Sequence, residues 1–174
     1  YIKRNPLHLY RQQRRGGKGV TGMETREEDF VENLFVASTH DYVLLFTNQG
    51  RAFWLKVHQI PEAGRAARGK AVVNLIRLEI GEKVVGFLPT KEFRDDRFVM
   101  LATREGKVKK TPLSSFSNAR TNGVIALGVQ EGDEMIAAVL SDGQSDVMLA
   151  TRDGLSIRFR EEEVRPMGRT AAGV

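Results

Sequence analysis

Short apolar runs recur along the chain, and each is closed by the same kind of turn. Three of these runs lead into Thr-x-x-Gly and then into a second strand-like run, and they occupy residues 42–46, 98–102 and 147–150. β-Prone runs bounded by such a turn predict hairpins, because the glycine supplies the positive φ that closes a turn with a bulge. The turn glycines are 56 and 48 residues apart. The pattern therefore predicts one hairpin in each repeat of about fifty residues.

A second landmark, a glycine-containing loop, follows each turn glycine after 17 to 19 residues. These loops contain Gly69, Gly123 and Gly173, and Gly17-Lys18-Gly19-Val20 fits the same slot near the N-terminus. With Gly17 as the first member, successive copies are 52, 54 and 50 residues apart. The N-terminal loop is therefore one copy of a loop that each repeat carries.

The remaining apolar runs bring each repeat to about four short strands. Strand-like runs lie at 72–76, 124–127, 83–88 and 135–140. Single helical turns are predicted at 56–60, 112–116 and 159–164. No stretch shows a long amphipathic stripe of helical period, so the fold class is all-β.

Four short strands per unit predict propeller-like blades. We expect about three blades plus the start of a fourth. The predicted divisions are a basic region at 1–23, a first blade at 24–90, a second at 91–140, and a third with the start of a fourth at 141–174. The chain begins without Met and ends within a repeat, so we expect it to be part of a longer protein.

The N-terminal loop concentrates positive charge and glycine. It consists of Gln13, Arg14, Arg15, Gly16, Gly17, Lys18 and Gly19. Residues 1–20 carry six cations and no acid, whereas the whole chain has a net charge of only +5. Arginine and lysine on a glycine-rich loop can contact phosphates, and a segregated basic patch is typical of nucleic-acid binding. The alternative from composition alone is a solvated basic loop.

At all seven positions this heptad resembles the box that marks the C-terminal domain of the A subunit of bacterial DNA gyrase. Val20-Thr21-Gly22-Met23 and Arg165-Pro166-Met167-Gly168-Arg169 resemble the same family. The resemblance implies a β-pinwheel, in which hairpins exchange between neighbouring blades. It also implies a non-catalytic domain that wraps duplex DNA and thereby lets an ATP-dependent type II topoisomerase introduce negative supercoils.

The resemblance also implies partners and sites. The partners would be double-stranded DNA, the N-terminal domain of the gyrase A subunit, which precedes this one, and the gyrase B subunit of an A2B2 holoenzyme. ATP and Mg²⁺ would act on other domains. We expect no cofactor or metal in this chain, a cytoplasmic location and no membrane. The DNA contacts would come from the heptad and from the equivalent loops. The further candidates on those loops and on one strand are Arg65, Arg68, Lys70, Arg120, Lys107 and Lys109.

Two other functions stay open. The C-terminal domain of a topoisomerase IV subunit has the same fold class, but its heptad is usually degraded. A propeller-type protein-interaction scaffold would leave the cations solvated and would bind protein instead of DNA. An enzyme is disfavoured because the chain has no cysteine, and its three histidines, His8, His40 and His58, lack metal-ligand spacing.

Overall fold

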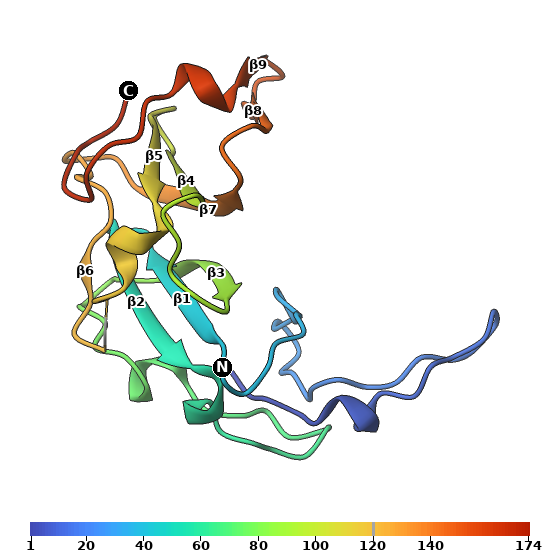
Figure 1. The fold of residues 1–174 in the computed structure, drawn as a ribbon. Coiled ribbons are helices and arrows are strands. Elements are labelled where there is room, and N and C mark those ends of the chain that lie inside the picture. Colours follow the sequence, from blue (N-terminus) through green and yellow to red (C-terminus); the bar gives the residue numbers. More distant parts are fainter. Residues whose placement is uncertain (120) are drawn as a thin grey trace.

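The computed structural model describes residues 1–119 and 121–174 (Figure 1). Its strands are β1 (Tyr42–Thr47), β2 (Arg51–Lys56), β3 (Val84–Thr90), β4 (Phe98–Thr103), β5 (Val108–Pro112), β6 (Val124–Ile125), β7 (Met135–Ser141), β8 (Asp146–Ala150) and β9 (Ser156–Arg160). Its helices are short 3-10 turns: η1 (Leu7–Leu9), η2 (Val57–Gln59), η3 (Val72–Asn74), η4 (Leu113–Phe116) and η5 (Glu161–Glu163). The all-β prediction is confirmed, and none of the helices described has the length or apolar character that a bilayer span requires.

The strands form three antiparallel sheets that follow one another in chain order (Figure 1). The first has the order β3-β1-β2-β6, the second β5-β4-β7, and the third is the hairpin β8-β9. β6 follows β5 in the chain, yet it pairs with β2 of the preceding hairpin. One unit therefore completes its sheet with a strand from the next unit.

The same exchange recurs at each junction. At each junction the residue after the loop glycine pairs with the unit before: with β2 or β5 at two junctions, and with Ile2 in an isolated bridge at the third. The pairs are Val124 with Ala52, Val174 with Val108, and Lys70 with Ile2. Such strand exchange is the feature that distinguishes a pinwheel from a propeller of self-contained blades. It also crosses the predicted boundary between 24–90 and 91–140, because β6 completes the sheet of β1 to β3.

The Thr-x-x-Gly motif has a direct structural reason. In each hairpin the threonine hydroxyl accepts a hydrogen bond from the backbone N–H of the residue after the glycine. The donor–acceptor distances are 3.2 Å for Arg51 to Thr47, 3.2 Å for Lys107 to Thr103 and 3.1 Å for Leu155 to Thr151. The glycines Gly50, Gly106 and Gly154 have φ values of 78°, 84° and 85°. Side chain and backbone together close the turn, as the sequence pattern predicts.

The run of buried residues in β1 shows that this sheet is covered on both faces. Val43 and Leu45 pack into a cluster with Leu55, Ile76 and Ile2. Their neighbours Leu44 and Phe46 point the other way, into a cluster between the first and second sheets that includes Val99, Leu101 and Phe116. Successive strand residues point to opposite faces, so the uninterrupted apolar run marks a strand that is buried on both faces.

Some expected elements are confirmed and one is wrong. The helical turns expected at 56–60, 112–116 and 159–164 are η2, η4 and η5. The strand expected at 72–76 is instead the 3-10 turn η3. Val72, Leu75 and Ile76 pack into one cluster, and spacing of three and four residues places side chains on one face of a helical turn, not of a strand.

Alanine at two turn glycines should separate backbone strain from close packing. Gly50 and Gly154 both have positive φ, so each change carries a backbone cost of about 1–2 kcal/mol. A Cβ at Gly50 would lie 2.4 Å from the carbonyl oxygen of Leu127, whereas a Cβ at Gly154 would meet nothing within 4 Å. Gly50→Ala should therefore lower the free energy of unfolding by roughly 2 kcal/mol more than Gly154→Ala. Urea unfolding followed by Trp54 fluorescence measures the difference, and equal losses would contradict the packing account.

Candidate nucleic-acid interface

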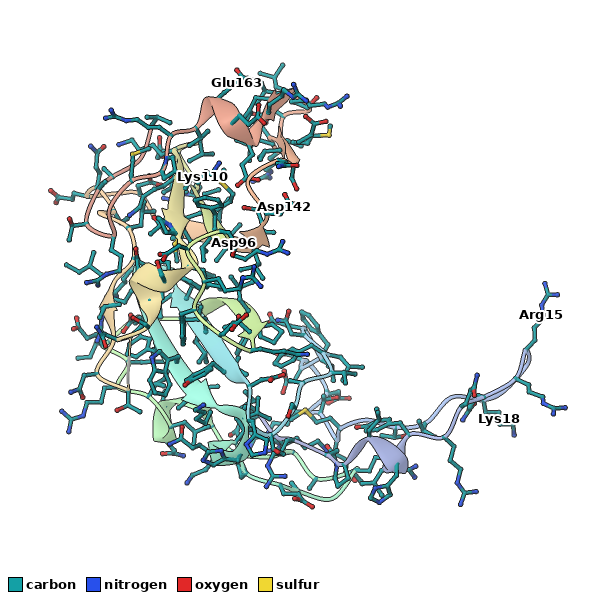
Figure 2. The ribbon with its side chains drawn as sticks, viewed as in Figure 1. Arg15, Lys18, Asp96, Lys110, Asp142 and Glu163 are labelled. Carbon is teal, nitrogen blue, oxygen red and sulfur yellow. The ribbon has the colours of Figure 1, made fainter. Side chains whose placement is uncertain are left out.

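The heptad lies at the end of an arm that leaves the body of the molecule. Figure 1 shows this arm extending from the N-terminal part of the chain, and Figure 2 shows Arg15 at its far end with Lys18 along it. The backbone N–H of Gly17 donates to the carbonyl of Arg14 at 2.9 Å, and the N–H of Gly19 donates to Gln13 Oε1 at 2.8 Å. Gln13 thus closes the loop from within.

The glycine conformations give a second alignment of the repeat. Gly16 and Gly19 have φ 86° and 74°, in the same region as Gly69 at 88°, Gly123 at 72° and Gly173 at 88°, whereas Gly17 is not among the positive-φ glycines. Counted from Gly19, the first spacing is 50 residues to Gly69. Arg15, Arg65 and Arg169 then share one position, four residues before the glycine.

The six cations of residues 1–20 divide into two groups. Arg11, Arg14, Arg15 and Lys18 are exposed; across residues 1–119 and 121–174, no carboxylate forms an ion pair with any of them. The other two are held internally. Arg4 Nη1 lies 2.7 Å from Glu62 Oε2, and Lys3 Nζ donates to backbone carbonyls of the loop at 64–67. The exposed charge is therefore concentrated on the arm.

The second loop brings three predicted residues together. Arg65 is exposed at its tip, and Arg68 is half-buried with its guanidinium carbon 5.5 Å from the centre of the Tyr1 ring. Lys70 has an exposed side chain, while its backbone N–H and carbonyl pair with Ile2 at 3.0 and 2.8 Å. This loop can present its cations to an anionic surface. Arg120, predicted in the third loop, lies outside the described residues.

Of the two predicted strand lysines, Lys107 is half-buried beside its turn, and Lys109 is fully buried. Lys109 Nζ donates to Ala126 O at 2.6 Å, to Ala171 O at 3.1 Å and to Arg169 O. The prediction that Lys109 contacts DNA is therefore wrong, because the loop of the next unit covers this face of β5 and takes up the ammonium's donors. Burial and the nearby charge of Arg169 lower the pKa of Lys109 to about 8.

The next residue, Lys110, reaches the following unit from the opposite face of β5. Its Nζ lies 3.4 Å from Glu161 Oε1 and donates to the Glu161 carbonyl at 3.3 Å. Two residues at the equivalent position do the same: Trp54 Nε1 donates to Ser117 O at 3.0 Å, and Arg4 Nε donates to Ile60 O at 2.9 Å. Two successive residues of each second strand thus join neighbouring units. Local sequence patterns could not predict these contacts, because their partners are about fifty to sixty residues away.

Comparison with known families decides what this fold is. The chain matches the family described as "DNA gyrase C-terminal domain, beta-propeller" over residues 1–38, 41–91, 97–142 and 145–174. The chain belongs to the DNA gyrase C-terminal domain family. The four matched segments follow the repeat that the glycine loops mark. The resemblance inferred from the heptad is thereby confirmed.

Individual relatives agree with the family assignment. The chain is 48% identical over all 174 residues to the A subunit of DNA gyrase from Klebsiella oxytoca, and 46% identical to that of Clostridium acetobutylicum. It spans about a fifth of their length, 20% and 21% respectively. Among solved structures, the C-terminal domain of DNA topoisomerase IV matches with TM-score 0.73 and 31% identity over 78% of this chain and 42% of that one. A DNA gyrase A C-terminal domain matches the same fold with TM-score 0.70 and 21% identity, over 100% of this chain and 56% of that one.

The buried ammonium of Lys109 should titrate far below ordinary lysines. Burial lowers its pKa to about 8, against about 10.4 for a lysine in an unfolded chain. Between these values the unfolded chain holds a proton that the folded chain has released, so the Lys109 contribution to the free energy of unfolding rises with pH from about 8 to 10.4. NMR titration of the lysine Cε and Nζ signals, assigned with Lys109→Met, measures the pKa. A value near 10.4 would show that the three carbonyls outweigh burial.

Proposed function

We propose that this chain binds duplex DNA through its basic glycine loops and bends the duplex along their edge, as the DNA-wrapping domain of a gyrase A subunit. The observation that carries the proposal is the arm: four exposed cations, Arg11, Arg14, Arg15 and Lys18, lie on one extended segment. Arginine offers a planar pair of donors to phosphate, and lysine offers a compact charge. Such an arm suits a polyanion better than a protein surface of mixed charge.

Binding of this kind reads the DNA backbone more than its bases. The described residues contain no α-helix that could enter the major groove as a recognition helix. The cations lie on loops that recur along the chain, so contacts to successive phosphates are expected. Sequence preference would then come mainly from how readily the duplex deforms.

The free-energy cost of bending the duplex must be offset by these phosphate contacts. Curving tens of base pairs through a large angle costs several kcal/mol by elastic estimates. The arm and the loops at Arg65 and Arg169 belong to different units and lie at the periphery of the ribbon (Figure 1). A duplex that follows one loop after another gains phosphate contacts as it curves, whereas a straight duplex reaches fewer of them.

In the larger enzyme the wrap would act topologically. The assembly would be an A2B2 holoenzyme, in which this chain works with the N-terminal domain of the gyrase A subunit, which precedes it, together with the gyrase B subunit. A wrap of one hand would present an adjacent duplex segment for passage through the cleaved gate. That bias would let an ATP-driven type II topoisomerase introduce negative supercoils in the cytoplasm. ATP and Mg²⁺ would be used by the other domains, and this chain would contribute no catalytic residue.

Removing three cations of the arm should weaken DNA binding on the order of 100-fold at about 0.15 M salt, because each phosphate contact contributes about 0.9 to the log–log salt slope. The variant is Arg14→Ala/Arg15→Ala/Lys18→Ala in the complete polypeptide that carries this chain. The salt slope should become shallower by about 3. Affinity for linear duplexes of increasing length, measured at two salt concentrations by fluorescence anisotropy, gives both quantities.

The matched control removes the same charge elsewhere. Lys83, Lys91 and Arg97 are exposed and lie outside the glycine loops, so Lys83→Ala/Lys91→Ala/Arg97→Ala should change affinity and slope much less. If the two triple variants lose equal affinity for DNA, the arm contributes only through the net charge of the protein. Weak, salt-independent binding by the unmodified protein would contradict the proposal and favour the protein-interaction scaffold.

A further inference from the structure

Two lysines, one half-buried and one fully buried, occupy the same place in different units. Ile2 and Val108 each receive the exchanged strand of the next unit, through Lys70 and Val174. The residue after each is a lysine, Lys3 or Lys109. Lys3 is half-buried and its pKa is lowered by burial, while Lys109 is fully buried. Both side chains point to the loop that precedes the exchanged strand.

The two ammonium groups hold equivalent peptide groups. Lys3 Nζ donates to the carbonyls of Arg65 at 2.5 Å, Ala67 at 2.7 Å and Gly64 at 2.9 Å. Lys109 Nζ donates to the carbonyls of Arg169, Ala171 and Ala126. Arg65 and Arg169 each lie four residues before the loop glycine, and Ala67 and Ala171 each lie two residues before it. All three acceptors of Lys3 lie in its loop, whereas Lys109 has two acceptors in its loop and a third, Ala126 O, just after β6, so each ammonium has three carbonyls for its three donors.

The unit between them supplies a natural contrast. At the equivalent position stands Phe53, which is fully buried and fills the space next to Gly123, where a Cβ would lie 2.6 Å from the ring. Strand exchange therefore does not require a lysine here. In that unit Ala119 occupies the position held by arginine in the other loops. Within this chain the lysine occurs where an arginine stands four residues before the loop glycine, and it is absent where Ala119 stands at that position.

We propose that Lys3 and Lys109 are positioning residues for DNA binding: each ammonium fixes the peptide groups around Arg65 or Arg169 so that the arginine is presented to a phosphate. Arg65 is exposed, whereas Arg169 is half-buried and its Nη1 donates to Ile125 O at 3.3 Å, which leaves its other N–H donors for the phosphate. This inference rests on the proposed function. A loop held in its binding shape loses less conformational entropy when the DNA arrives.

The test replaces the lysine and measures hydrogen exchange in the loop and affinity for DNA separately, in the complete polypeptide at neutral pH. Lys109→Met removes the donors, and Lys109→Phe reproduces the arrangement at Phe53. Hydrogen exchange at Ala171 and at Gly128, whose N–H donates to Ala171 O at 3.1 Å, should become roughly tenfold faster or more. Exchange within the β4–β5 hairpin should stay unchanged. Affinity for duplex DNA should fall roughly 3- to 10-fold.

A double-mutant cycle with Arg169→Ala separates positioning from a general structural effect. If Lys109 acts through Arg169, Lys109→Met should cause little further loss of affinity once Arg169 is removed. Lys91→Met is the control: it removes the same charge from an exposed site outside the glycine loops and should leave loop exchange unchanged.

Three results would overturn the inference: unchanged exchange in the loop, faster exchange with unchanged DNA affinity, or fully additive losses in the cycle. None of them decides the proposed function, which the arm variant tests independently. If Lys109→Met does not fold, Lys3→Met gives the same comparison in the loop of Arg65, with exchange at Ala67, whose N–H donates to Gly64 O, as the readout.

Discussion

The rest of the structure depends on one contact, the pairing of the exchanged strand of each unit with the unit before it. It pairs next to a loop glycine of positive φ, and the three described junctions leave no room for a side chain there. A Cβ would lie 2.5 Å from Ile2 O at Gly69, 2.6 Å from the Phe53 ring at Gly123 and 2.5 Å from Val108 O at Gly173. The regular glycine spacing in the sequence therefore reflects how closely adjacent units approach.

The exchange also determines where charge can be placed. A loop that ends at the exchanged strand is anchored at the joint between two units, so its tip lies at the periphery, where Arg65 is exposed. In the receiving strand, one side chain packs beneath this loop. The side chain of the next residue contacts the 3-10 turn of the following unit. Lysine or phenylalanine takes the first position, as in Lys109 and Phe53, and Arg4, Trp54 or Lys110 takes the second. Cations in this fold thus serve two purposes: those of the receiving segment form internal hydrogen bonds, and those of the loops are placed for external binding.

The sequence was sufficient for most features encoded by local chemistry, the 3-10 turn at Val72–Asn74 being the exception. The Thr-x-x-Gly turns, the paired strands around them and the three 3-10 turns follow from residues that are neighbours in the chain. It was insufficient where a distant segment decides the environment. Period-two alternation places Lys109 on a face of its strand, but the loop that buries it lies about sixty residues later. For the same reason Lys3 and Arg4 were counted with the basic patch, although their charges are taken up by the loop and by Glu62.

The central claim is that duplex DNA follows the edge formed by the glycine loops. Site-specific photo-cross-linking tests it most directly, with p-benzoylphenylalanine placed singly at Arg15, Arg65 or Thr170 on three loops, and at Ile80 or Glu162 on exposed turns outside them. The account predicts cross-links to one bound duplex from all three loop positions, at successive sites along the DNA, and none from the two control positions. Cross-links from Ile80 or Glu162 as strong as those from the loops would contradict it.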